Sequence, residues 1–102
     1  MTETDTAIRH VVIRGLVQGV GYRAWTERAA LAHGLEGWVR NRRDGSVEAV
    51  FAGAPDKVAG LIEACRQGPR GARVDAVDQW DAASPALSPR RAGERFSLLP
   101  TI

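Results

Sequence analysis

The stretch Gly-Leu-Val-Gln-Gly-Val-Gly-Tyr-Arg at residues 15–23 organises the rest of this chain. An apolar run at residues 11–13 leads into it, and a pattern typical of a helix follows it over residues 24–33. Because glycine has no Cβ, the backbone N–H groups of such a loop can approach one point between the strand and the helix. N–H groups gathered at a helix N-terminus suit an anion, above all a phosphate.

The last residue of that stretch, Arg23, falls in the predicted first turn of the helix. A cation there is unfavourable for the helix dipole, and a bound anion would compensate for it. We therefore expect the loop to bind a phosphoryl group. On glycine count alone, a turn that only solves a packing problem is an open alternative. The spacing matches neither the nucleotide P-loop, which needs Gly-Lys-Ser/Thr, nor the Gly-x-Gly-x-x-Gly dinucleotide fingerprint.

Strand and helix patterns alternate along the chain. Apolar residues at every second position indicate strands, whereas apolar residues at helical spacing over 58–65 indicate a helix. The pair Asp44-Gly45 is typical of a tight hairpin, and Gly34 is typical of the left-handed residue that ends a helix. We expect strands over residues 8–14, 35–42, 46–52, 72–80 and 96–99, one helix over residues 22–33, and a second helix from residues 53–56 to the stop at 68–69.

This order is β-α-β-β-α-β with a short extra C-terminal strand. Parallel neighbours need a helical crossover, so two split β-α-β units form one mostly antiparallel sheet with both helices on one face. We therefore predict an α+β fold of the ferredoxin-like sandwich class. It forms a single domain over residues 1–102, with a disordered start at 1–6 and a loop at 81–93. Because this fold carries many functions, it does not decide the function.

The composition is that of an ordinary soluble globular domain, with 102 residues, 44% hydrophobic residues, 25% charged residues and a net charge of +2. One cysteine and two histidines argue against a disulfide framework and against a cysteine or histidine metal centre. No apolar run is long enough to span a membrane, and no signal peptide is apparent, so we expect a cytoplasmic protein.

A second candidate residue, Asn41, lies near the end of the second predicted strand. The alternation of a strand places Asn41 and Val39 on one face, and Trp38 and Arg40 on the other. The predicted topology brings this strand back beside the glycine loop. A carboxamide at that point can accept from a water and donate to an oxyanion. On the residues alone, an asparagine that only closes the turn before the hairpin is the simpler alternative.

Two rival chemistries find little support. A covalent phosphocysteine route needs Cys-x5-Arg, but the sixth residue after Cys65 is Gly71, and Cys65 lies on the apolar stripe of the second helix. Asp75, Asp78 and Asp81 recur every three residues, which does not place all three on one strand face. We expect these aspartates to form a solvated edge and no metal site.

The two motifs together closely resemble those of acylphosphatases. The resemblance covers roughly residues 8–99, and both the motif sequences and their separation agree. It is carried by Val-Gln-Gly-Val-Gly-Tyr-Arg at 17–23, Gly-Trp-Val-Arg-Asn at 37–41, Asp-Gly-Ser-Val-Glu at 44–48, Gly-Pro at 68–69 and Ala-Arg-Val at 72–74.

This resemblance implies a small hydrolase of carboxyl-phosphate anhydrides that uses no metal and no cofactor. It implies that Arg23 is the catalytic arginine and Asn41 the catalytic asparagine, which orients the attacking water. The phosphate-binding residues that it implies are Gln18, Gly19, Val20, Gly21, Tyr22 and Arg23. The chain departs from the usual pattern at Tyr22, where phenylalanine is usual, and at His33, where an aliphatic residue is usual; we expect His33 only to pack.

The expected partner is a small acyl phosphate substrate, with inorganic phosphate or sulfate as a competing ligand of a monomeric protein. A non-catalytic module of the same fold that binds carbamoyl phosphate or phosphate is the alternative. A nucleic-acid module is the other alternative, because its fold overlaps with this one. Such modules carry exposed aromatic residues on central strands, but the first strand here has none and the third only Phe51. With a net charge of only +2, we expect neither nucleic acid nor membrane as a partner.

Overall fold

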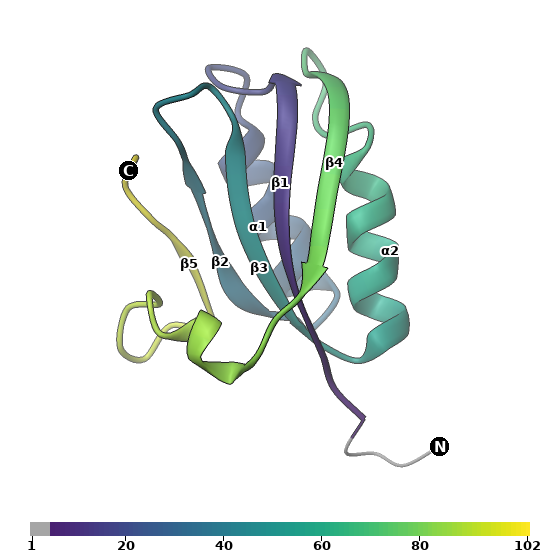
Figure 1. Ribbon diagram of the computed structural model, residues 1–102, viewed down its shortest axis with the longest axis vertical. Coiled ribbons are helices and arrows are strands. Elements are labelled where there is room, and N and C mark those ends of the chain that lie inside the picture. The colour runs from purple at the N-terminus through teal and green to yellow at the C-terminus, as the bar shows by residue number, and fades with distance from the viewer. Residues whose placement is uncertain (1–4) are drawn as a thin grey trace.

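The computed structural model describes residues 5–102 and contains one five-stranded sheet with two α-helices. The sheet order is β4-β1-β3-β2-β5; β2 and β5 are parallel and the other neighbours are antiparallel. Both helices cover the same face of the sheet (Figure 1). The elements are β1 (Ala7–Leu16), α1 (Tyr22–Ala32), β2 (Glu36–Asn41), β3 (Val47–Gly53), α2 (Pro55–Cys65), β4 (Arg73–Asp81), the 3-10 helix η1 (Ser84–Leu87) and β5 (Phe96–Leu98).

The predicted α+β ferredoxin-like fold is confirmed, and each predicted strand and helix lies within a few residues of an observed one. The predicted loop over residues 81–93 is wrong in part, because Asp81 ends β4 and η1 forms within the segment. Two features stabilise η1: Pro85 suits the first turn of a helix, and the Trp38 indole N–H donates a 2.7 Å hydrogen bond to the Ala86 carbonyl. Of the predicted disordered start at 1–6, residues 1–4 lie outside the described residues. No helix within residues 5–102 is long and apolar enough to cross a lipid bilayer.

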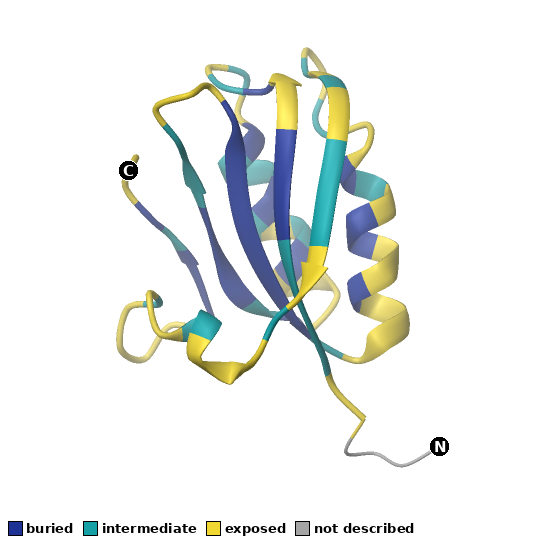
Figure 2. Ribbon diagram, in the orientation of Figure 1, coloured by how far each residue is buried: buried dark blue, intermediate teal, exposed yellow. Residues whose placement is uncertain are grey.

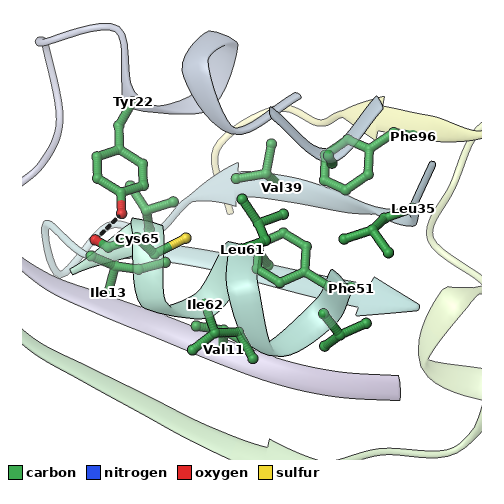
Figure 3. Packing of buried hydrophobic residues seen from close by; sticks show 14 of the residues in the cluster. Val11, Ile13, Tyr22, Leu35, Val39, Phe51, Leu61, Ile62, Cys65 and Phe96 are labelled. Carbon is green, nitrogen blue, oxygen red and sulfur yellow. Dashed lines mark hydrogen bonds between the residues drawn. The ribbon is translucent and has the colours of Figure 1, made fainter. Parts of the chain in front are cut away.

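The main core lies between the sheet and the two helices. Alternate residues of β1 and β3 face the helices, and α2 contributes its predicted apolar stripe (Figure 3). Each large side chain buried there contributes about 1.5–3 kcal/mol to stability. The fully buried members include Val11, Ile13, Phe51, Leu61 and Cys65.

The opposite face of the sheet carries a smaller apolar cluster. Trp38, Val50 and Leu99 pack there, and Ala86 and Leu87 of η1 cover them. Strand β3 is consequently buried on both faces over nearly its whole length, whereas β4 is exposed or intermediate (Figure 2). The sheet is therefore most completely buried at its central strand, β3.

The edge strand β4 carries the three regularly spaced aspartates, and each pairs with an arginine. Asp75 lies 3.5 Å from Arg73, Asp78 lies 3.1 Å from Arg14, and Asp81 contacts Arg9. Their exposed side chains confirm the predicted solvated edge. Surface pairs of this kind contribute at most about 1 kcal/mol each, so they do not decide the fold.

A buried carboxylate lies at the centre of the outer face of the sheet. Glu48 of β3 is only 8% exposed, accepts a 2.8 Å hydrogen bond from Arg40 Nε and lies 2.6 Å from His10 Nε2. The Arg40 guanidinium also lies 4.6 Å above the Trp38 ring. Burial raises the pKa of the Glu48 carboxyl, but the hydrogen bonds from Arg40 and His10 outweigh it and hold that pKa below its ordinary value.

We predict that Glu48→Gln lowers the free energy of unfolding near pH 7 by about 1.5–3 kcal/mol, because a charged hydrogen-bond acceptor is lost. The folded-state pKa is lowered, so this stabilisation is fully present above the ordinary value of 4.5 and is lost as the pH falls below it. Urea unfolding near pH 7 and near pH 3 should show the two proteins converging in acid. Glu63→Gln, at a highly exposed surface pair, is the control and should change stability by less than about 0.5 kcal/mol. An equal difference at both pH values would contradict the prediction.

Candidate active site

The glycine loop joins the end of β1 to the start of α1. Gly19 and Gly21 have φ angles of +76° and +80°, which side chains with a Cβ rarely adopt, and Gly21 is the residue that caps α1. A Cβ added at either glycine would meet no protein atom within 4 Å. These glycines are therefore required by the backbone conformation, and the space around them is open.

A hollow of about 190 Å³ lies beside this loop. Its lining combines the loop, the first turn of α1, the end of β2 and one residue of β5. Five of the six predicted phosphate-binding residues line it together with Asn41, whereas the side chain of Val20 packs against the main core. The lining residues are Val17, Gln18, Gly19, Gly21, Tyr22, Arg23, Ala24, Asn41 and Leu98.

A larger hollow of about 530 Å³ lies beside residues 87–95, away from the glycine loop. Its guanidinium groups already have partners, because Arg90 bonds to Glu36 at 2.9 Å, Arg91 to the Leu98 carbonyl and Arg95 to the Gly34 carbonyl. Its size alone therefore does not make it the better candidate. The smaller hollow combines open backbone groups, a helix N-terminus and an arginine.

Arg23 lies in the first turn of α1, as the sequence predicts. Its guanidinium donates to the Leu99 carbonyl at 3.1 Å and forms no ion pair with any residue within 5–102. The first turn of α1 contains no acidic residue. The arginine charge and the positive end of the helix dipole therefore coincide without an acidic residue in that turn, which favours an anion at this point.

Asn41 is the last residue of β2 and lines the same hollow. The predicted alternation of β2 is confirmed, since Val39 packs in the main core and Trp38 in the outer cluster. The Asn41 carbonyl accepts a hydrogen bond from the Ile102 amide at 3.1 Å. Within residues 5–102 its side-chain carboxamide has no hydrogen-bond partner, so this group can engage a ligand.

The sequence did not indicate that the C-terminal segment runs beside β2 past this residue. The Leu99 amide donates to the Val39 carbonyl at 2.8 Å, and the Arg43 amide donates to the Ile102 carbonyl at 3.0 Å. The same segment supplies the Leu99 carbonyl that Arg23 binds. The apolar residues at 96–99 predicted a strand, but they did not indicate that it pairs in parallel with β2.

Tyr22 anchors the start of α1 and faces away from the hollow with its hydroxyl. The hydroxyl donates to the Cys65 carbonyl at 2.6 Å, at the end of α2 (Figure 3). The ring packs edge-on to Trp25, and a Cβ at Gly68 would lie 2.4 Å from it. This hydrogen bond joins the start of α1, next to Arg23, to the end of α2.

The Tyr22 hydroxyl and the Cys65 thiol are unsuited to act as an acid, a base or a nucleophile. Burial raises the pKa of the Tyr22 phenol, and burial raises the pKa of the Cys65 thiol to about 12. The predicted core position of Cys65 is confirmed.

The expectation that His33 only packs is wrong, because His33 is exposed at the end of α1 and its ring lies 2.8 Å from the Ala29 carbonyl.

We predict that Tyr22→Phe lowers the free energy of unfolding by about 1–3 kcal/mol, because it keeps the ring but leaves a buried acceptor unsatisfied. The Cys65 carbonyl would then lose a partner. Chemical denaturation measures this difference. Phosphate affinity, measured by titration calorimetry, should change less than about threefold because the hydroxyl does not face the hollow. A large loss of phosphate affinity without loss of stability would contradict this reading of the hydroxyl.

Comparison with known proteins identifies the family of the chain. A family model described as Acylphosphatase matches residues 9–91. An acylphosphatase of Bradyrhizobium diazoefficiens is 64% identical over 96 residues, which cover 94% of this chain and 97% of the relative. An acylphosphatase of Nitrobacter hamburgensis is 58% identical over 98 residues, which cover 96% of this chain and 99% of the relative.

Solved structures agree in fold. An acylphosphatase from Coxiella burnetii superposes with a TM-score of 0.83 at 29% identity, covering 97% of this chain and 98% of that one. The region matched by the family model includes the glycine loop, Arg23 and Asn41. The chain belongs to the acylphosphatase family.

Proposed function

We propose that the chain hydrolyses acyl phosphates by in-line attack of a water molecule, with Arg23 binding the phosphoryl group and Asn41 orienting the water. As an acylphosphatase the chain is an enzyme that converts the carboxyl-phosphate bond into a carboxylate and inorganic phosphate. One observation supports the residue roles most: Arg23 and Asn41, from separate elements, line one hollow at the N-terminus of α1.

The chemistry of the substrate explains why so few groups are needed. In the reaction the water oxygen forms a bond to phosphorus, the phosphorus–oxygen bond to the acyl group breaks, and the carboxylate leaves with the bonding electron pair. The leaving carboxylate has a pKa near that of a side-chain carboxyl, about 4, so it departs without being protonated. The proton of the attacking water passes to solvent or to the phosphate product. No general acid is therefore required.

Arg23 supplies the principal electrostatic stabilisation in this proposal. Phosphoryl transfer depends on positioning and on neutralising charge on the equatorial oxygens. A guanidinium can donate two parallel hydrogen bonds to two of these oxygens, while the N–H groups of residues 18–22 bind the others. Removal of one preorganised donor of this kind costs about 2.7–4 kcal/mol of transition-state stabilisation.

Asn41 acts by orientation. A carboxamide is too weakly basic to take a proton, but it accepts a hydrogen bond from a water and donates one to a phosphoryl oxygen. Leu98, which also lines the hollow, is apolar and cannot orient a water in this way. Misplacing the attacking group by about 1 Å can lower the rate about 10²-fold, so this role suffices to make Asn41 essential.

The proposal needs neither a metal nor a cofactor. Within residues 5–102 no three histidine, cysteine, aspartate or glutamate residues are arranged to hold a metal ion. We therefore expect turnover in the presence of excess chelator. We also propose that the protein acts as a cytoplasmic monomer and that inorganic phosphate or sulfate competes with the substrate.

We predict that Arg23→Ala lowers kcat/KM for benzoyl phosphate by at least about 10³-fold and abolishes phosphate binding, because the main ligand of the phosphoryl group is lost. Arg28→Ala, which removes an exposed arginine of the same helix, is the matched control and should leave both unchanged. Assays with excess chelator and calorimetric titration with inorganic phosphate measure the two quantities. Turnover that persists in Arg23→Ala would show that the assigned site is wrong.

We predict that Asn41→Ala lowers kcat by at least about 10²-fold while inorganic phosphate still binds, because the water loses its orientation and the phosphate ligands remain. Single-turnover rates and phosphate titration separate the two effects. Full turnover in this variant would contradict the water-orienting role. A wild-type protein that binds phosphate but does not hydrolyse benzoyl phosphate would favour the non-catalytic phosphate-binding alternative.

A further inference from the structure

We propose that the side chain of Gln18 is a positioning residue that ties the glycine loop to the β2–β3 hairpin and so holds Asn41 in register with the phosphoryl group. The inference rests on the proposed function and assigns one residue of the phosphate loop a second task. Its side chain acts through Asn41, while only its backbone N–H is left to face the phosphoryl group.

The geometry of the Gln18 carboxamide carries the inference. Its Nε2 donates to the Arg42 carbonyl at 2.7 Å and to the Ser46 carbonyl at 2.9 Å. These two carbonyls flank the neck of the hairpin, where the Arg42 amide also donates to the Ser46 carbonyl at 2.9 Å. Asn41 immediately precedes this neck and pairs with Val47.

The chemistry of the two partners determines which end of the carboxamide faces them. Both partners are carbonyl oxygens, which only accept, so the NH₂ group and not the oxygen must face the hairpin. Its two N–H donors are then both used. The side chain of Gln18 therefore has no donor left for a phosphoryl oxygen, although Gln18 lines the hollow.

The loop has little else to connect it to the hairpin. Within residues 5–102 the backbone of residues 17–20 forms no hydrogen bond to residues 42–46, and the β1–β3 ladder ends at the pair Ile13 and Val47. Two residues of the loop, Gly19 and Gly21, have positive φ angles and add no side-chain contact. Within residues 5–102 the Gln18 carboxamide therefore supplies the hydrogen bonds that join the glycine loop directly to the hairpin.

The hairpin neck is itself rigid enough to serve as an anchor. The Asp44 carboxylate accepts hydrogen bonds from the Ser46 hydroxyl at 2.6 Å and from the Ser46 amide at 2.9 Å. These bonds hold the pKa of the exposed Asp44 carboxyl below its ordinary value. Gln18 therefore binds a turn that is already closed by its own residues.

The functional consequence follows because the glycine loop and β2 have different tasks in the proposed reaction. The glycine loop holds the phosphoryl group, whereas β2 holds the group that orients the water. In-line attack requires both at one relative position, and an error of about 1 Å is costly. A connection between loop and hairpin is therefore expected to affect kcat much more than phosphate affinity.

The test compares Gln18→Met, which keeps the length of the side chain and removes both donors, with Gln67→Met at an exposed position as the matched control. We expect Gln18→Met to lower kcat for benzoyl phosphate about 10- to 100-fold. The calorimetric affinity for inorganic phosphate should change less than about threefold. The control should change neither, and Gln18→Ala serves as the second variant if Gln18→Met does not fold.

A double-mutant cycle with Asn41→Ala separates positioning from a general loss of stability. If Gln18 acts through Asn41, Gln18→Met lowers the residual single-turnover rate of Asn41→Ala by less than about threefold. Equal losses in both backgrounds would overturn the inference. If Gln18→Met lowered phosphate affinity and left kcat unchanged, the inference would also be overturned, because the side chain would then be a phosphate ligand.

A spectroscopic measurement keeps the inference testable apart from turnover. In ¹⁵N-labelled protein the side-chain NH₂ signal of Asn41, identified by its loss in Asn41→Ala, should shift in Gln18→Met and not in Gln67→Met. An unchanged Asn41 signal would overturn the positioning role even in an active enzyme. A shifted signal in a protein that does not hydrolyse benzoyl phosphate would retain the connection while rejecting the proposed function.

Discussion

Arg23 places a full positive charge at the positive end of the α1 dipole, and no acidic side chain in that turn offsets it. The penalty for a cation at a helix N-terminus is about 0.3–1 kcal/mol, which is small beside the burial of a single core residue. The fold can therefore maintain an arginine at this helix end without a compensating acidic residue in the same turn, provided that the start of α1 is held in place. Two contacts meet that condition, since Tyr22 bonds to the end of α2 and Arg23 bonds to the Leu99 carbonyl.

The site depends on two elements that are separate in the chain and adjacent in the sheet. The glycine loop follows β1, the hairpin joins β2 to β3, and both lie at the same end of the sheet (Figure 1). Strand β3 lies between β1 and β2 and is buried on both faces. A central strand of this kind keeps the distance between loop and hairpin nearly constant, because interior packing resists deformation.

The outer face of the sheet contributes to that rigidity in an unusual way. Its buried Glu48 is bonded to Arg40 on β2 and to His10 on β1, so one carboxylate connects the three central strands. A buried charge is costly without partners and becomes stabilising only when its hydrogen bonds are made. The same network therefore favours one register of β1, β3 and β2, in which Asn41 and Arg23 line the same hollow.

Local patterns in the sequence determined the order of the elements, the positive φ angle of Gly34, and the face on which Asn41 lies. These features depend on neighbouring residues alone, through the period of a strand or helix and the steric freedom of glycine. Together with the resemblance of two paired motifs, they were enough to predict the fold and six of the residues that line the hollow, but not Val17, Ala24 and Leu98.

The tertiary structure alone decided which groups complete that hollow. The carbonyl partners of Gln18, the anchoring of Tyr22 on α2, the parallel pairing of the C-terminal segment with β2, and the formation of η1 all join residues far apart in the sequence. A side chain with a hydrogen-bonding end takes whichever partner the packed chain brings within reach. For that reason the sequence predicted Gln18 as a member of the phosphate loop, while only the folded chain showed where its carboxamide is bound.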